Sequence, residues 1–423
     1  MWKFDITQLP SGLHVVSLPM PGVQSVSVGI WTSVGSRYEK KSLNGAAHFI
    51  EHLLFKGTKN RSAKQISSEI EGRGGYLNAV TSEESTCYYA RARSSELPFL
   101  VEVLGDIYIN AILDPTEVER ERGVIREEIL MYNEQPATVA HELLNLSLWP
   151  GDAVGRPVTG TLNTIQKITR TQLQDFRTKM YGAQNTWLVA AGNIDHTQLV
   201  ACAHKTFANW QGAKKTPKLH HKPFKNPAHK TLHTEHDQVQ IAVGFRGLHR
   251  THADRFALRV LNVILGENMS SRLFQSLREE RGWAYSIGSH IQLFHGTGSL
   301  IIQAGVDTKK WQSALDIILQ ECRRLATANI SRKELARARE YAIGNTWLGL
   351  ESSSDVMFWI GECLVAFGKI IDPIITEQHL AAITAQDVRR VASQIFSAKN
   401  RAIVVTGPGI TSQHLHERLS LHT

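Results

Sequence analysis

The chain has 423 residues and a mass of 47.2 kDa, a length that fits two or three domains rather than one. Hydrophobic residues make up 42% of it and charged residues 20%, which allows a packed core and excludes global disorder. Six lysines and no acid lie within residues 211–234, and without them the net charge falls from +8 to +2. The basic charge is therefore local. With no recognisable nucleic-acid-binding motif, it predicts a solvated linker and no nucleic-acid partner.

The cysteines lie far apart and have no paired spacing, so neither a cysteine metal site nor a disulfide scaffold is expected; they are Cys87, Cys202, Cys322 and Cys363. This usage indicates a reducing compartment. Residues 1–21 lack the apolar core of a secretory signal, and no run approaches the length of about 18 apolar residues that a membrane span needs. We therefore expect a cytoplasmic protein of the bacterial type, with no membrane partner.

The first predicted helix covers residues 44–57, with Asn44 near its N-cap, and it carries the string HFIEH. Residues four apart share a helix face, so His48 and His52 can bind one metal ion. Glu51 borders that face, where it can take a proton from water without being a ligand. The same string also fits a helix with two partly exposed histidines and no metal.

The second helix relevant to the site is predicted for residues 114–134, because Asp, Pro and Glu occupy its N-cap, N1 and N3 positions. Glu121 and Glu128 lie two turns apart on one face, which also carries Val124 and Ile125. A zinc site needs a third protein ligand, and either glutamate could supply it while the other supports the ligands from behind. An exposed, charged helix face explains the same residues without a metal.

Later segments of the chain repeat earlier ones. Residues 380–409 match residues 165–194 at a constant offset of 215, and each copy reads as a threonine-capped helix, a short turn and an apolar strand ended by glycine. The string VQIAVGF from Val239 echoes VQSVSVGI from Val23, and an Arg-Gly pair recurs as well. Two unrelated domains that share the same order of helices and strands would explain single matches, but several in the same order favour a duplication.

The duplication predicts an α+β fold of two related domains, each a mostly antiparallel sheet packed with helices. We expect a first domain at residues 1–210, a basic linker at residues 211–234 and a second domain at residues 235–423. Alternating, strand-like runs support this reading; they cover residues 23–30, 85–92, 239–245 and 299–304.

Three strings, HFIEHLLFKGT, GRGGYLNAVTSEESTCYYARA and ERERGVIREEIL, resemble the zinc peptidases of the pitrilysin family, which carry the inverted HxxEH motif. The resemblance is greatest to the branch that contains mitochondrial processing peptidase and its bacterial relatives. It implies one zinc ion per chain with the ligands His48, His52 and Glu128. It also implies that Glu51 is the general base and that Glu121 is a supporting acid.

The resemblance extends to the substrate. It implies that the strand around Asn78 and Ala79 is the edge on which a peptide lies as an added strand. The second half contains no HxxEH, and there the family supplies an Arg and a Tyr seven residues apart; Arg278 and Tyr285 have that spacing. In this role, the tyrosine stabilises the oxyanion and the arginine holds a peptide carbonyl.

The leading hypothesis is a zinc metalloendopeptidase that hydrolyses peptides or unfolded segments. The resemblance further implies two chains around a chamber, and we expect a homodimer, with a heterodimer as the alternative. A non-catalytic, structural partner subunit of the same family is the competing reading. Zinc content and peptide cleavage separate the two.

Overall fold

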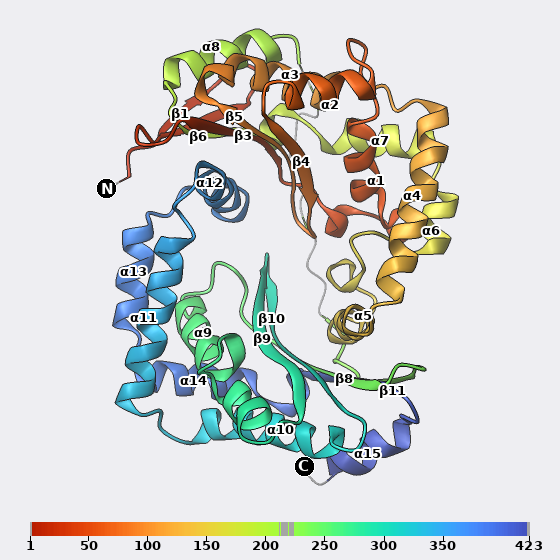
Figure 1. The fold of residues 1–423 in the computed structure, drawn as a ribbon, viewed down its shortest axis with the longest axis vertical. Helices are drawn as coiled ribbons and strands as arrows, with labels where there is room; N and C mark the ends of the chain where they lie inside the picture. The colour runs from red at the N-terminus through yellow and green to blue at the C-terminus, as the bar shows by residue number, and fades with distance from the viewer. Residues whose placement is uncertain (1, 211, 213–218, 220–223, 421–423) are drawn as a thin grey trace. The chain divides into compact units, whose positions relative to one another are not determined.

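The computed structural model describes residues 2–210, 212, 219 and 224–420. It divides into two compact units (Figure 1), neither of which is a continuous stretch of chain. The first contains Met1–Leu130, Arg156–His220 and Trp347–Asp372, and the second contains Met131–Gly155, His221–Thr346 and Pro373–Thr423.

The first unit is built on a six-stranded sheet with the order β1-β2-β6-β3-β5-β4. Only β2 and β6 pair in parallel, and all other pairs are antiparallel. Its strands are β1 Asp5–Gln8, β2 His14–Pro19, β3 Ser25–Thr32, β4 Tyr76–Thr81, β5 Thr86–Arg93 and β6 Thr186–Gly192. Its helices are α1 Ala46–Leu54, α2 Ala63–Glu71, α3 Leu97–Asn110, α4 Pro115–Asn133, α6 Leu162–Lys167, α7 Arg170–Met180, α8 His196–Phe207 and α12 Ser353–Phe367.

The second unit repeats this plan with a five-stranded sheet of order β7-β11-β8-β10-β9, in which only β7 and β11 are parallel. Its strands are β7 Lys230–His233, β8 Gln238–Arg246, β9 Ala284–Phe294, β10 Thr297–Asp307 and β11 Arg401–Gly407. Its helices are α5 Pro136–Leu148, α9 Arg255–Asn262, α10 Trp311–Thr327, α11 Arg332–Leu348, α13 Pro373–Ala382, α14 Ala385–Ile395 and α15 Ser412–Ser420, with π-helical turns at Val263–Glu267 and Phe274–Glu279.

The two sheets confirm the predicted fold class, and the order β2-β6-β3-β5-β4 in the first matches β7-β11-β8-β10-β9 in the second. Thr169 caps α7 and Thr384 caps α14, each with its side-chain oxygen accepting a hydrogen bond from the backbone N–H three residues on. The strands that follow, β6 and β11, begin at the same offset of 215 residues that the sequence predicts. Each half therefore encodes the same five-stranded order with its one parallel pair, and the first sheet adds β1 beside β2.

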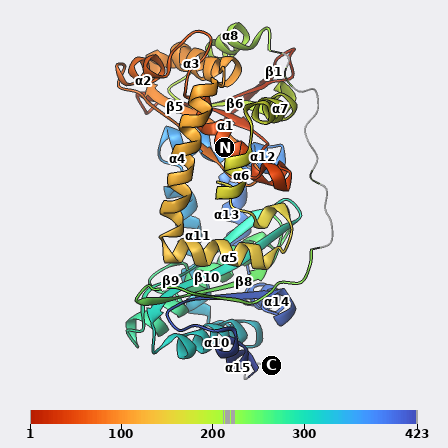
Figure 2. The same ribbon diagram turned by 90° about the vertical axis from the view of Figure 1, so that its right-hand side faces the viewer.

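Each sheet is completed by a helix that belongs, in chain order, to the other half. Helices α3 and α8 cover one face of the first sheet, and α12 covers the opposite face (Figure 1). Helix α5 packs along β8 and β11 of the second sheet (Figure 2). The contact of α12 is close because Gly361 has no side chain there; a Cβ at this position would lie 2.0 Å from the Trp31 ring.

The compact units thus differ from the continuous domains, 1–210 and 235–423, expected from the duplication. Much of the predicted linker, at 211, 213–218 and 220–223, lies outside the described residues, and Lys230–His233 at its end forms β7. Within the described part of the chain, no helix combines the length and apolar character needed to cross a membrane.

Candidate metal centre

Helix α1 places two histidines on one face while its other sides are buried in the core. Ala47, Phe49 and Ile50 are fully buried, so the helix cannot rotate without exposing them. His48 and His52 lie one turn apart, and their ring centroids are 4.7 Å from each other. The local sequence therefore sets both the helix and the direction of its imidazoles.

Helix α4 brings Glu128 against both histidines. Its Oε2 atom lies 3.6 Å from the Nε2 of His48 and 3.7 Å from the Nε2 of His52. One ligand atom from each of the three side chains lies within 4.8 Å of the others. Among the described residues, this is the only group of three metal-ligating side chains found so close together.

The electrostatics of the cluster favour the metal-ligating form of His48. Burial, together with the neighbouring His52, lowers the pKa of His48 to about 4. A neutral imidazole carries the nitrogen lone pair that a metal needs, whereas a protonated one does not. Two histidines and a carboxylate are a donor set that fits Zn²⁺ and leaves one tetrahedral position open.

Glu121 lies behind His52, where it accepts a hydrogen bond from Nδ1. Its Oε2 is 3.1 Å from that nitrogen, its Oε1 is 2.8 Å from the Nζ of Lys56, and only 1% of the residue is exposed. When Nδ1 carries the proton, the lone pair that a metal can use is on Nε2, and Nε2 is the atom that faces Glu128. The crossing of α4 over α1 thus separates two glutamates that the sequence left equivalent.

Of the two apolar residues expected on the face of α4 that carries Glu121 and Glu128, only one is buried. Ile125 is fully buried, but Val124 is 46% exposed. The expectation that Val124 shares the buried face of Glu121 is therefore wrong. At about 100° per residue, Val124 lies about 60° around the helix from Glu121, on the side away from Ile125, and that side faces solvent.

Glu51 completes the group next to the two histidines. Burial raises its pKa above the ordinary glutamate value; a hydrogen bond with Thr81 and the charge of His52 act in the opposite direction, and Glu128 adds to the rise. Thr81 is the last residue of β4, so Glu51 lies beside the end of that strand. The side chain is therefore close to both the possible metal and the sheet edge.

The start of α1 is held by Glu39, a residue that the sequence analysis missed. Its Oε1 accepts from the Ala47 N–H at 2.7 Å, and its Oε2 accepts from the Gly45 N–H at 2.8 Å and from Asn44 Nδ2 at 3.2 Å. Asn44, expected near the N-cap, instead donates to Glu39 and to the Pro157 carbonyl. Glu39 lies outside the spacing of a capping box, so no local pattern could have identified it.

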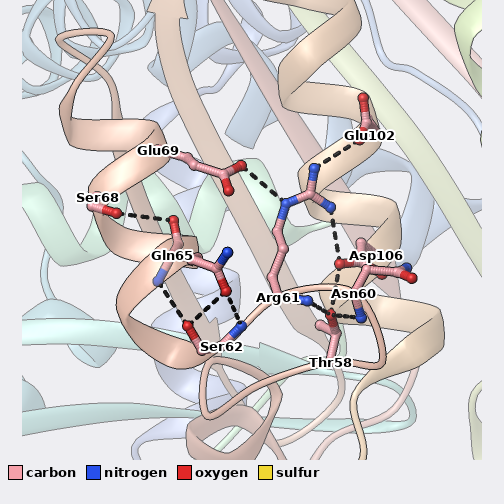
Figure 3. Close-up of polar contacts among 9 residues, drawn as sticks. All are labelled: Thr58, Asn60, Arg61, Ser62, Gln65, Ser68, Glu69, Glu102 and Asp106. Atoms are coloured by element: carbon pink, nitrogen blue, oxygen red, sulfur yellow. Dashed lines mark hydrogen bonds and ion pairs between the residues drawn. The ribbon is translucent and has the colours of Figure 1, made fainter.

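The other end of α1 leads into a loop fixed by a polar network (Figure 3). Arg61 donates to Asp106 at 3.0 Å and also contacts Glu69 and Glu102, while Thr58 donates to Asp106 at 2.7 Å. Burial alone would raise the pKa of Asp106, but hydrogen bonds from Thr58, two asparagines and Arg61 outweigh it and lower the pKa. Helix α1 is thus anchored at both ends.

Strand β4 forms an outer edge of the first sheet. Asn78 and Ala79 lie in its middle, and in the described residues no strand pairs with its outer side. The N–H of Ala79 donates to Asn78 Oδ1 at 2.8 Å rather than to a strand. An unpaired strand edge of this kind can accept an extended peptide.

Arg278 and Tyr285 belong to the second unit, and both are exposed. Arg278 lies in the π-helical turn with its guanidinium 5.2 Å from the ring centroid of Phe274, and Tyr285, 78% exposed, lies near the start of β9. Strand β9 is itself an outer strand of its sheet. The contact of these two side chains with a substrate stays a prediction.

Two family models match successive parts of the chain. A family model described as Insulinase (Peptidase family M16) matches residues 14–162, and one described as Peptidase M16 inactive domain matches residues 167–341. The first range contains all the residues of the cluster. Most of the second range lies in the half of the chain that has no HxxEH.

Curated relatives match over nearly their whole length. An uncharacterized zinc protease of Streptomyces coelicolor is 36% identical over 412 residues, covering 95% of this chain and 89% of the relative. One from Bacillus subtilis is 33% identical over 400 residues, covering 94% and 97%. Among solved structures, a protease from Helicobacter pylori superposes with a TM-score of 0.90 at 24% identity, covering 96% of this chain and all of that one.

Proposed function

The chain belongs to peptidase family M16, the insulinase or pitrilysin family, and from this membership we propose that it is a zinc metalloendopeptidase that cleaves peptides or unfolded polypeptide segments. The observation that carries the proposal is the convergence of His48, His52 and Glu128 beside Glu51. This donor set fits a catalytic zinc, since it combines three protein ligands with an open position. The names of the curated relatives, which are zinc proteases, support the metal.

A zinc ion held by these three side chains would act as a Lewis acid: it would polarise the peptide carbonyl and lower the pKa of the attacking water. Glu51 accepts a proton from the attacking water and delivers it to the leaving amine nitrogen. Glu121 accepts the proton on Nδ1 of His52 in a hydrogen bond, so that the lone pair is on Nε2, which faces the cluster. Each of these residues acts through an atom whose surroundings are described above.

The substrate, in this proposal, binds along the outer edge of β4. Its backbone pairs with the strand near Asn78 and Ala79, which gives affinity without dependence on sequence. Since Glu51 contacts Thr81 at the end of the same strand, an added peptide passes close to the catalytic carboxylate. Arg278 and Tyr285 are proposed to contact the peptide carbonyl and the oxyanion from the second unit.

The decisive variant is Glu51→Gln, because an amide cannot accept the proton of water. We expect it to retain zinc and to lose nearly all cleavage of a peptide library, a loss of at least about a hundredfold. Glu119→Gln is the matched control, since Glu119 is an exposed glutamate on α4 whose carboxylate pairs with Arg122. Cleavage by Glu51→Gln at close to the wild-type rate would reject the assigned role.

A second candidate is a non-catalytic partner subunit. It is favoured by the description of the second family model as an inactive domain. That model, however, matches from residue 167 onward and leaves residues 14–162, with the whole cluster, to the peptidase model. This alternative would be favoured if zinc-loaded wild-type protein cleaves no peptide of the library.

A further inference from the structure

The side chains of β4 alternate between two different surroundings. Leu77 and Ala79 pack against the core of the first unit, and Thr81 on the same side contacts Glu51. On the opposite side, Tyr76 is 53% exposed and Val80 is 44% exposed. The strand thus has one face toward the metal-bearing helix and another that offers large apolar side chains to solvent.

Three aromatic rings form a row that begins on the exposed face of β4. We call these residues, Tyr76, Tyr89 and Phe358, the aromatic shelf. The ring centroids of Tyr76 and Tyr89 are 6.1 Å apart, and those of Tyr89 and Phe358 are 4.8 Å apart with the rings nearly perpendicular. Phe358 comes from α12 and packs edge-on against Trp31 of β3, 5.5 Å away. The shelf therefore rests on a rigid part of the sheet.

Hydrogen bonds fix the outer rings of the shelf. Asn78 Nδ2 donates to the hydroxyl of Tyr76 at 2.6 Å. Burial and a hydrogen bond with Tyr76 raise the pKa of Tyr89 to about 12, so its hydroxyl stays protonated and able to donate. Rings held in this way lose little conformational entropy when a ligand covers them. An ordered, exposed aromatic surface beside an unpaired strand edge is the arrangement expected of a peptide-binding subsite.

We propose that the aromatic shelf is a subsite for a large apolar or aromatic side chain of a peptide bound along β4, an inference that rests on the proposed peptidase function. A peptide strand paired with β4 sends every second side chain to the face of Tyr76. The intervening side chains point to the side of Thr81 and Glu51. Only every second side chain of the substrate can therefore contact the shelf.

The position of the favoured residue follows from the length of β4. Tyr76 and Thr81 are the first and last residues of the strand, so they lie about 16 Å apart along it. A peptide residue beside Tyr76 is then about five residues from the one beside Thr81, where Glu51 lies. The shelf selects a residue remote from the cleaved bond, and its contribution is to binding rather than to the chemical step.

The test moves a single phenylalanine along an otherwise polar peptide and measures KM and kcat for each position. With the wild type, we expect KM to fall about tenfold when phenylalanine lies four to six residues from the cleaved bond, in alternation with neighbouring positions, while kcat stays unchanged. Tyr76→Ala should abolish this preference, and Tyr76→Phe should keep it. Ile6→Ala is the matched control, since Ile6 is 50% exposed on β1 at the opposite edge of the same sheet.

Binding measured without turnover separates this inference from the proposed function. Zinc-loaded Glu51→Gln protein, with and without Tyr76→Ala, is titrated with fluorescent phenylalanine and alanine versions of the peptide. A tenfold preference that disappears with Tyr76→Ala supports the subsite, even if the wild type proves inactive. A phenylalanine preference that survives Tyr76→Ala, or none in Glu51→Gln protein that keeps Tyr76, would overturn the subsite while leaving the peptidase assignment intact.

Discussion

Gly45→Ala tests how tightly the start of α1, the helix that carries His48 and His52, is fixed. Gly45 directly precedes α1 and has a φ of 97°, in a region that costs other residues about 1–2 kcal/mol. An added Cβ would also lie 2.7 Å from the Thr159 carbonyl oxygen and 2.6 Å from Cδ1 of Ile165. Backbone cannot move aside as a flexible side chain can, so this overpacking costs a further 1–3 kcal/mol or so. We expect a total loss of about 3 kcal/mol.

Gly74→Ala provides the control, because it has the same kind of strain without the clash. Its φ is 69°, and in the described structure an added Cβ at Gly74 would meet no atom within 4 Å. We expect it to lose about 1 kcal/mol. The assays are urea unfolding of the metal-free protein, amide exchange of α1, and zinc affinity by competition with a chelator. The clash displaces the helix that carries His48 and His52, so Gly45→Ala should bind zinc at least tenfold more weakly than the control.

Two results would refute this reasoning. Equal losses of stability in Gly45→Ala and Gly74→Ala would mean that the neighbouring loop yields to the added methyl group without cost. Reduced stability with the zinc affinity of the control would mean that the start of α1 does not position the ligands.

Three further predictions concern the metal, the pH response and the assembly. The wild type should carry about one zinc per chain and His52→Ala essentially none, so two ions per chain, or zinc retained by the variant, would contradict the ligand set. The folded-state pKa of Asp106 is lowered, so its carboxylate stabilises the protein above its ordinary pKa of 3.8, and that stabilisation is lost as the pH falls through the lower, folded value. Asp106→Asn should cost about 1–3 kcal/mol near neutral pH and flatten acid unfolding, and an acid profile like that of the wild type would argue against the network. Light scattering should find a homodimer near twice 47.2 kDa, and a stable, active monomer would exclude it.

Much of the fold could be read from local patterns. Threonine caps and alternating apolar residues identified the repeated helix and strand at residues 165–194 and 380–409, and the structure has them at that offset. These signals are local because capping and strand burial involve residues close together in the chain. The exchange of α5 and α12 between the sheets had no such signal, because it depends on close packing between segments far apart, as where Gly361 meets Trp31.

The candidate site divides in the same way. The sequence by itself determined that His48 and His52 share one face of a helix, which Glu51 borders, because four residues make about one helical turn. It could not separate Glu121 from Glu128, since both lie on the same face of one helix. Only the tertiary structure decided that Glu128 faces both histidines while Glu121 bonds to Nδ1 of His52, because this depends on how α4 crosses α1. The aromatic shelf is decided by the same kind of packing, because its rings come from β4, β5 and α12.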